Sequence, residues 1–255
     1  MESVIPSIEV RSLSFRYPDG TPALDHVSLR VEAGECVGLL GPNGSGKSTL
    51  LHHLNGILPE RLPAEGGVVF IEGDAVTAKT VSTVRRRTGL LFQDPDDQLF
   101  CSTVAEDIAF GPQQLGLPDS EIAHRVKEAL EQVGLTSLAH RPPHHLSAGE
   151  KRRACLAGVL ACSPGILVLD EPTSGLDPRG RRELIALLRG ISATKLIATH
   201  DLEFVVELCP RSVILDRGCV IADGPTEALL NDEPLMLAHG LERPHVLQHS
   251  HPHPS

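Results

Sequence analysis

The 255-residue sequence is poor in aromatic residues, with no tryptophan, one tyrosine and six phenylalanines. Proteins that bind single-stranded nucleic acids stack the bases on aromatic side chains, so this composition disfavours that class. Basic residues are also in the minority, because 23 lysines and arginines stand against 33 aspartates and glutamates, a formal net charge of −10. Domains that neutralise phosphate backbones usually carry a basic excess. Nucleic acid is therefore not an expected ligand.

Long apolar segments are absent as well. The sequence has no uninterrupted stretch of about 18 apolar residues, and its first residues lack the basic and apolar regions of a signal peptide. We expect a chain that neither spans a membrane nor is exported. The six cysteines form no Cys-x-x-Cys pair and show no zinc-ligand spacing. They are expected to be reduced thiols that are mostly buried.

Short apolar runs alternate with segments of helical spacing along most of the chain. Residues 8–15 and 27–31 alternate apolar and polar side chains, which predicts two half-exposed antiparallel strands. A continuous apolar run at 36–40 predicts a strand buried on both faces, and further short buried strands are predicted at 166–169, 195–198 and 213–215. Strands that alternate with helices predict an α/β fold with a mainly parallel sheet, next to a small antiparallel β subdomain.

The stretch from about 94 to 160 interrupts this alternation, because it has helical character and no clear strand. Within it, residues 120–133 carry apolar side chains at helical spacing and predict an amphipathic helix that Gly134 ends. We therefore predict an inserted helical subdomain.

A phosphate-binding loop is predicted between the run 36–40 and the helical segment after it. The pattern G-x-x-x-x-G-K-S is matched by Gly41, Pro42, Asn43, Gly44, Ser45, Gly46, Lys47 and Ser48, with Thr49 next in the chain. Glycines let backbone amides surround phosphates, the lysine reaches the β and γ phosphates, and the Ser48 hydroxyl can bind Mg²⁺. The alternative is a glycine-rich turn without function, but the strand before it and the helix after it favour nucleotide binding.

Two carboxylates, Asp170 and Glu171, follow the apolar run 166–169. Such a pair often starts a helix. Beside a phosphate loop, Asp170 is expected to hold Mg²⁺ and Glu171 to polarise a water at the γ phosphate. GTP is disfavoured, because the sequence has no Asn-Lys-x-Asp motif. The pattern predicts an ATPase.

The segment Leu146-Ser147-Ala148-Gly149-Glu150 stands 24 residues before Asp170 and resembles the signature motif of ATP-binding cassette (ABC) ATPases. Locally it also predicts a capping box, with Ser147 at the N-cap and Glu150 three residues later. In the family the motif binds the γ phosphate held by the partner subunit. Ala148 and Glu150 depart from the usual glycine and glutamine. The basic residues at 151–153 could offset Glu150, although such runs usually form a solvated face.

Other ABC elements follow in the expected order over residues 8–240. The resemblance implies that Tyr17 stacks on adenine, Gln93 contacts Mg²⁺ and the water, Asp177 belongs to a D-loop that crosses a dimer, and His200 contacts the γ phosphate. A lone histidine at a strand end is more often structural, but its position 30 residues after Asp170 favours the catalytic role. The implied fold is a RecA-like P-loop NTPase, an ABC nucleotide-binding domain with its helical signature subdomain.

Three segments narrow the resemblance to the ATPase of energy-coupling factor (ECF) importers, especially the cobalt/nickel (CbiO-type) branch: residues 92–100, 109–112 and 239–242. This implies a homodimer, or a dimer with a paralogous ATPase, that binds a transmembrane T-component and a substrate-binding S-component at the cytoplasmic membrane face. Asp94 stands where asparagine is commoner. An ECF ATPase for vitamins and a soluble ABC ATPase outside transport remain as alternatives.

Histidine and proline dominate the C-terminal end, and the division predicted is an ATPase domain at 1–240 and a disordered tail at 241–255. Four histidines could bind a transition metal there: His245, His249, His251 and His253. The alternatives are a tail without function and a metal chaperone in which the tail is the principal element.

Overall fold

The computed structural model describes residues 5–244 and residue 247, which form two β-sheets and nine α-helices. The larger sheet has six strands in the spatial order β10 (Cys219–Pro225), β9 (Arg211–Asp216), β3 (Cys36–Leu40), β8 (Thr194–Ala198), β7 (Ile166–Asp170) and β6 (Thr88–Leu91). From β9 to β6 neighbouring strands are parallel, and β10 pairs antiparallel with β9. The predicted mainly parallel sheet is confirmed.

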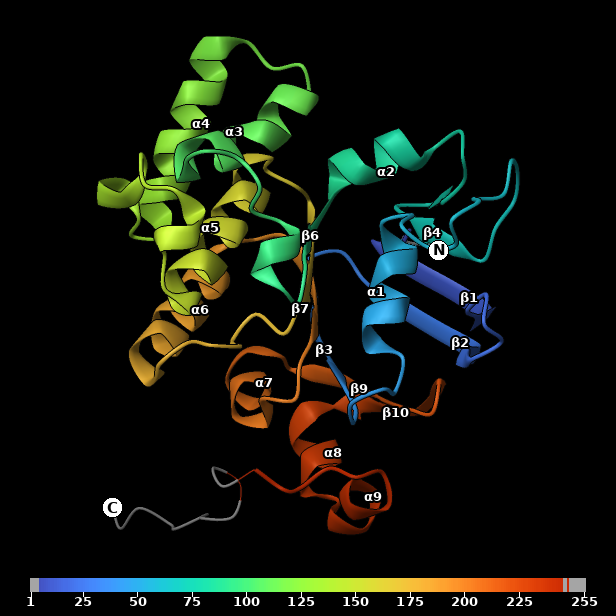
Figure 1. Cartoon of the computed structure of the whole chain (residues 1–255). Helices are drawn as coiled ribbons and strands as arrows, with labels where there is room; N and C mark the ends of the chain where they lie inside the picture. Colours follow the sequence, from blue (N-terminus) through green and yellow to red (C-terminus); the bar gives the residue numbers. More distant parts are fainter. Residues whose placement is uncertain (1–4, 245–246, 248–255) are drawn as a thin grey trace, which may run out of the picture.

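Strands β3 and β7 are built mainly from continuous apolar runs because helices cover both faces of the parallel sheet (Figure 1). All five residues of β7 and of β8 are buried. The strand predicted at 36–40 is confirmed, and those at 166–169 and 195–198 are one residue longer, at Asp170 and Thr194. β10, which the sequence analysis did not predict, alternates partly buried and exposed residues at the sheet edge.

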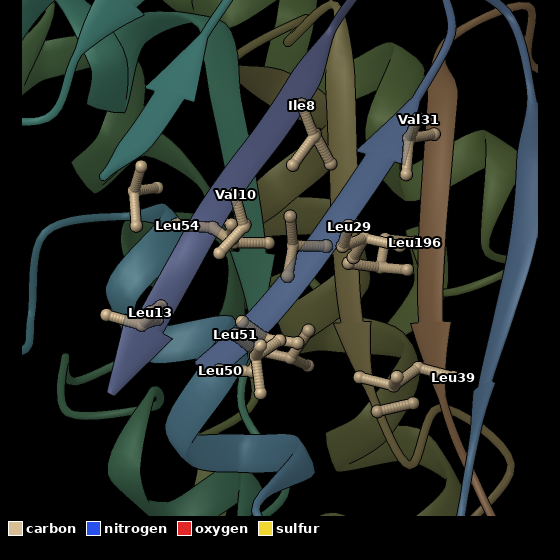
Figure 2. Close-up of a cluster of buried hydrophobic side chains, with 14 of the residues drawn as sticks. Ile8, Val10, Leu13, Leu29, Val31, Leu39, Leu50, Leu51, Leu54 and Leu196 are labelled. Atoms are coloured by element: carbon tan, nitrogen blue, oxygen red, sulfur yellow. The ribbon is translucent and has the colours of Figure 1, made fainter. Parts of the chain in front are cut away.

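The smaller sheet is antiparallel and has the order β2 (Pro22–Val31), β1 (Ile8–Arg16), β4 (Val69–Ile71) and β5 (Asp74–Ala75). The alternation predicted for residues 8–15 and 27–31 gives one buried face, on which Ile8 lies opposite Val31 and Val10 opposite Leu29. Figure 2 shows this face against Leu50, Leu51 and Leu54 of helix α1 and against Leu39 and Leu196 of the parallel sheet. The principal core therefore surrounds the helix that follows the phosphate loop.

Helices α3 to α5 lie together apart from the antiparallel sheet (Figure 1), and no strand occurs between residues 94 and 160. They share a separate apolar cluster that includes Val104, Ile108 and Leu130. The helix predicted at 120–133 is observed as α4, and Gly134 follows with a φ of 68°. The nine helices are α1 (Lys47–Leu54), α2 (Val81–Arg87), α3 (Val104–Gln114), α4 (Asp119–Gln132), α5 (Ala148–Ala161), α6 (Pro178–Gly190), α7 (Leu202–Leu208), α8 (Thr226–Asn231) and α9 (Glu233–Ala238).

The expected boundary at residue 240 lies inside a packed segment. Leu241 is 7% exposed and belongs to the apolar cluster that contains Leu230 and Met236. The body of the protein therefore extends past α9, because this leucine covers the helices before it. The histidines at 245, 249, 251 and 253 lie outside the described residues.

The expectation of mostly buried cysteines is wrong. All six are free thiols, but only Cys155 and Cys209 are buried, and the other four are partly exposed. Two of these four stand at the first residue of a strand, Cys36 in β3 and Cys219 in β10, and not in the middle of an element. Within the described residues, none of the helices has the length and apolar character needed to cross a membrane.

Candidate nucleotide-binding and hydrolysis site

Four predicted site segments follow four neighbouring strands of the parallel sheet. The phosphate loop follows β3, His200 follows β8, Asp170 and Glu171 end β7 or come directly after it, and Gln93 follows β6. The carboxyl ends of parallel strands meet at one edge of a sheet, which is where ligands bind in open α/β folds. The structure thus gathers residues that are up to 159 positions apart, from Gly41 to His200, along one edge.

The phosphate loop needs glycine at two positions. Gly41 and Gly46 have φ values of 152° and 107°. A Cβ on Gly41 would lie 2.0 Å from the carbonyl oxygen of Leu215, and one on Gly46 would lie 2.5 Å from that of Ala23. Both distances are too short for any side chain, so the close approach of the neighbouring backbone allows only glycine at these two positions. Helix α1 then begins at Lys47 and directs its amino end at the loop.

The rest of the loop borders the C-terminal part of the protein. A cavity of 320 Å³ is lined on one side by Pro42, Asn43, Gly44 and Ser45, and on the other by Asp216, Arg217, Ala238, His239 and Gly240. The Gly218 amide donates a hydrogen bond to the Ser45 carbonyl at 2.9 Å. His239 Nδ1 lies 2.9 Å from Asp216 Oδ2. The segment 239–242, noted in the sequence, therefore starts beside the phosphate loop.

The Lys47 ammonium is held inside the loop. Its Nζ donates to the carbonyl oxygens of Gly41 at 2.7 Å and Pro42 at 3.0 Å, and the residue is 7% exposed. Burial lowers the pKa of Lys47, whereas the nearby carboxylates of Glu171 and Asp170 act in the opposite direction. A cation so placed, with few water contacts, is suited to bind phosphate oxygens.

The three residues predicted to hold Mg²⁺ line one cavity of 520 Å³: Ser48, Gln93 and Asp170. Asp170 is 3% exposed, and burial raises the pKa of this carboxyl, while a hydrogen bond with Ser48 opposes the rise. A hydroxyl, an amide and a carboxylate supply the oxygen ligands that Mg²⁺ prefers. The donor set fits this ion.

Glu171 and His200 form a direct pair. His200 Nδ1 and its backbone amide lie 2.9 Å and 3.1 Å from Glu171 Oε1, and the Thr199 hydroxyl donates to Glu171 Oε2 at 2.9 Å. The Glu171 side chain is 7% exposed and that of His200 is 69% exposed. Glu171 also has a φ of 47°, an unusual value for a residue with a Cβ. Thr199 was not expected in the site, and the signal that points to it is its position in the chain between β8 and His200.

Arg152 is a second residue of the site that was not expected. For the basic run at 151–153 the sequence left open an offset to the charge of Glu150 or a solvated face, but Arg152 is 4% exposed. Its guanidinium donates to the carbonyl oxygen of Phe92 at 2.7 Å and to that of Gln93, and burial lowers its pKa. Arg152 thus ties the first turns of α5 to the backbone that carries Gln93. Lys151, 2.6 Å from Asp96, agrees better with the expectation of a surface contact.

Asp94, the departure left without a consequence in the sequence analysis, has a local role. It is the N-cap of a 3₁₀ turn at Pro95–Asp97, where its carboxylate accepts a hydrogen bond from the Asp96 amide at 2.9 Å. Asparagine and aspartate are comparable in such a position, so the substitution preserves the turn.

The signature segment forms the predicted capping box at the start of α5. The Ser147 hydroxyl accepts from the Glu150 amide at 3.3 Å, and Glu150 Oε2 accepts from the Ser147 amide and hydroxyl at 2.8 Å each. These bonds hold the pKa of Glu150 below its usual range. The Ser147 hydroxyl proton is therefore directed at a carboxylate of its own chain.

The two segments expected to cross a dimer interface lie side by side. A Cβ on Gly175 would lie 3.4 Å from the Cβ of Ala148, and one on Gly149 would lie 3.5 Å from the Leu176 side chain. Asp177 is the N-cap of α6 and accepts from the Gly180 amide at 2.6 Å. The signature and D-loop segments thus form one surface.

Tyr17, which follows β1 in the chain, lies beside the first turn of α1. Its hydroxyl is 2.8 Å from the Thr49 hydroxyl, and its ring packs edge to face with Phe15, with centroids 5.2 Å apart. The tyrosine is 37% exposed. An exposed aromatic ring fixed beside the phosphate loop is suited to stack on a base.

We expect Tyr17→Ala to weaken ATP binding about 10-fold, because base–aromatic stacking contributes about 1–3 kcal/mol. Tyr17→Phe is the matched control, since it keeps the ring and removes only the contact with Thr49. Fluorescence titration with an ATP analogue measures both. Equal affinities for the alanine variant and the wild type would contradict the stacking role.

Comparison with known proteins decides the family. Residues 24–174 match the sequence profile of the ABC transporter family. The chain belongs to this family. It is the ATP-binding subunit of an ABC transporter, an ATPase of the kind that acts as a dimer with membrane partners and couples ATP hydrolysis to transport.

Relatives of this ABC ATPase cover nearly all of it. A putative ABC transporter ATP-binding protein of Streptomyces avermitilis is 54% identical and aligns over 94% of this chain and 90% of its own length. The energy-coupling factor transporter ATP-binding protein EcfA of Methanothermobacter thermautotrophicus is 47% identical and aligns over 93% of this chain and 76% of its own length. The structure of CbiO1 of Clostridium perfringens, described as part of the ABC transporter complex CbiONQ, matches with a TM-score of 0.77 and 36% identity. The match covers 95% of this chain and 98% of the CbiO1 chain.

Proposed function

We propose that this ABC ATPase is the energy-coupling subunit of an ECF-type importer for cobalt or nickel, bound at the cytoplasmic face of the membrane. The observation that carries the proposal is the combination of EcfA relatives at 44–47% identity with the CbiO1 structure at a TM-score of 0.77. Two identical chains suffice for the ATPase dimer, because one chain contains every element of the site. A paralogous ATPase could take the second place.

In this proposal the amino end of α1 and Lys47 hold the phosphates of ATP, and Tyr17 holds the adenine. Ser48, Gln93 and Asp170, which line one cavity, would hold Mg²⁺, and the ion would supply positive charge to the phosphates there. Phosphoryl transfer depends mainly on such positioning and charge stabilisation.

Glu171 accepts the proton of the attacking water. Its carboxylate accepts hydrogen bonds from the Thr199 hydroxyl and the His200 amide, which would keep it in place when the exposed imidazole of His200 leaves Glu171 Oε1 and turns toward the γ phosphate. Ser147 and Gly149 of the second copy complete the phosphate cage. For this, the Ser147 hydroxyl must leave the Glu150 carboxylate, so Glu150 opposes dimer closure more than a neutral glutamine would.

The membrane partner requires a docking surface, and a cavity of 680 Å³ between β6, α3 and α5 offers one. Phe100 and Phe110 stand at this cavity with exposures of 63% and 40%, and their rings meet edge to face with centroids 4.9 Å apart. Arg85 and Arg86 line the same cavity. An amphipathic helix of the T-component with apolar and acidic residues fits this combination.

The test is Phe100→Asp in the assembled transporter. We expect basal ATP hydrolysis by the isolated subunit to stay near the wild-type rate, and both co-purification with the T-component and stimulation by it to fall at least about 10-fold, since a buried charge is costly at an interface. Leu237→Asp is the matched control, because Leu237 is 62% exposed on α9 and lies outside the cavity. Retained stimulation in the Phe100 variant would place the docking surface elsewhere.

Metal and vitamin transport are separated by uptake. Cells with and without this ATPase should differ in accumulation of labelled nickel or cobalt, and not in uptake of labelled vitamins. The opposite result would favour an ECF ATPase for vitamins, and failure to recover any membrane subunit would favour a soluble ABC ATPase. Loss of function on deletion of residues 244–255 alone, with ATP hydrolysis intact, would favour a metal chaperone.

A further inference from the structure

Two cysteines that are 173 residues apart in the sequence meet in the structure. Cys36 is the first residue of β3, and Cys209 directly follows α7. Their sulfur atoms lie 3.6 Å apart. A disulfide requires the sulfurs to approach to about 2 Å, so the two sulfurs must move closer together before they can be joined.

The backbone around both residues is held in place. Helix α7 packs closely on β3, because a Cβ on Gly38 would lie only 2.8 Å from Val205 Cγ1. The Cys209 amide donates to the Val205 carbonyl at 2.8 Å, and the Cys209 carbonyl accepts from the Thr226 hydroxyl at 2.5 Å. The packing of the helix on the strand therefore brings the two sulfur atoms together. The contact does not depend on chance encounters of mobile surface side chains.

The two thiols have different environments. Cys209 is 2% exposed, whereas Cys36 is partly exposed and can be reached by a small oxidant. A hydrogen bond with the Cys209 thiol and the positive charge of Lys195, its neighbour on β8, lower the pKa of Cys36. The same hydrogen bond and burial raise the pKa of Cys209. Since the thiolate is the reactive form, Cys36 is the nucleophile and Cys209 the second thiol.

Other thiols of the chain lack this arrangement. Burial raises the pKa of Cys101 to about 11 and that of Cys155 to about 12, and burial also raises the pKa of Cys162. Cys162 directs its thiol at the Gly158 carbonyl, 3.6 Å away, and Cys155 at the Pro95 carbonyl, 3.7 Å away. These thiols are therefore poorer nucleophiles than Cys36.

We propose that Cys36 and Cys209 are an oxidation site, at which a hydroperoxide converts the two thiols into an intramolecular disulfide. The Cys36 thiolate attacks one peroxide oxygen, the O–O bond breaks, and Cys36 becomes a sulfenic acid while the released hydroxide takes up a proton to form water. The Cys209 sulfur then attacks the Cys36 sulfur and expels hydroxide, which leaves as water with the Cys209 proton. Overall, two thiols and one hydrogen peroxide give one disulfide and two waters.

The bond would join the amino end of β3 to the carboxyl end of α7. Both positions lie at the edge of the sheet opposite the carboxyl ends that carry the phosphate loop and His200. Oxidation therefore leaves the ATP site intact and ties α7, which begins next to His200, to the strand that leads into the phosphate loop. The disulfide should stabilise the fold, because it closes a long loop in the unfolded chain and so reduces the conformational entropy of the unfolded state.

The experiment treats the reduced full-length chain with a small excess of hydrogen peroxide. Peptide mass spectrometry should find the peptides of Cys36 and Cys209 linked, with a loss of two hydrogens per chain. The Tm should rise by about 5–10 °C and return to its original value with dithiothreitol. ATP affinity should be unchanged.

Cys36→Ser and Cys209→Ser should each abolish the linked peptides and the rise in Tm, and Cys219→Ser, at another partly exposed cysteine, should abolish neither. The proposal is overturned if the disulfide joins other cysteines, or if Cys36 is oxidised to the sulfinic acid with no link to Cys209. The peptide map of the wild-type chain decides between these outcomes even if a serine at the buried position 209 prevents folding.

Discussion

Glu171→Gln should reduce the turnover of ATP by about 100-fold to 10,000-fold, the usual contribution of a general base, while ATP binding persists. Glutamine has the size of glutamate, and its one carbonyl oxygen, placed where Oε2 lies, can accept from the Thr199 hydroxyl at 2.9 Å and from the His200 amide at 3.4 Å. It cannot take a proton from water. ATP should therefore accumulate in the closed dimer, which size-exclusion chromatography with ATP and Mg²⁺ detects as a stable species of twice the monomer mass.

Glu183→Gln is the control for this variant, because Glu183 forms an exposed ion pair with Arg179 on α6 and does not line the cavity of Ser48, Gln93 and Asp170. Its hydrolysis rate should equal that of the wild type. Unimpaired hydrolysis by the Glu171 variant would remove Glu171 from the role of base, and the pairing of Glu171 with His200 would then serve only the structure.

Lys47→Ala should lower ATP affinity by about 100-fold, since each lost hydrogen bond to a charged group costs about 1.5–3 kcal/mol. In the structure the ammonium is bound by two loop carbonyls and almost excluded from water. When ATP binds, we expect the ammonium to exchange these carbonyl contacts for phosphate oxygens. Its positive charge is then the main charge in the loop that balances the negative phosphates. Equilibrium binding of a fluorescent ATP analogue measures the loss directly, independently of hydrolysis.

Lys79→Ala is the matched control, because Lys79 is exposed and its ion pair with Glu65 contributes little to stability. Circular dichroism should show that both variants fold. An ATP affinity of the Lys47 variant within about 2-fold of the wild type, a difference of only about 0.4 kcal/mol, would show that the helix end and the loop amides hold the phosphates without the lysine.

The local elements could be predicted because their determinants are neighbours in the sequence. The capping box of Ser147 and Glu150 and the N-cap of Asp177 depend on residues three positions apart. The strands β3 and β7 were recognised from apolar runs, which a sheet covered on both faces requires. Edge strand β10 was missed because its alternating pattern is weak. Strand β5 was missed because it has only two residues, too few to show a pattern.

The contacts that complete the site could not be predicted, because they join residues that the chain brings together only by folding. Glu171 and the backbone amide of His200 are 29 positions apart, and Arg152 and the Gln93 carbonyl are 59 apart. A basic residue in the pattern Lys-Arg-Arg carries no local sign of burial. Only the packing of α5 against the segment after β6 shows that Arg152, and not its neighbours, is directed inward.

The sequence by itself determined the family, the phosphate loop and the identity of the candidate base, since these rest on residue types at fixed spacing. The tertiary structure decided which groups act on one another: the pair of Glu171 and His200, the clamp of Arg152 on the Gln93 backbone, the surface shared by the signature and D-loop segments, and the contact of Cys36 with Cys209. The physical reason is that spacing along a chain specifies local hydrogen bonds, whereas distances between strand ends and helix faces are set by how the sheet and helices pack.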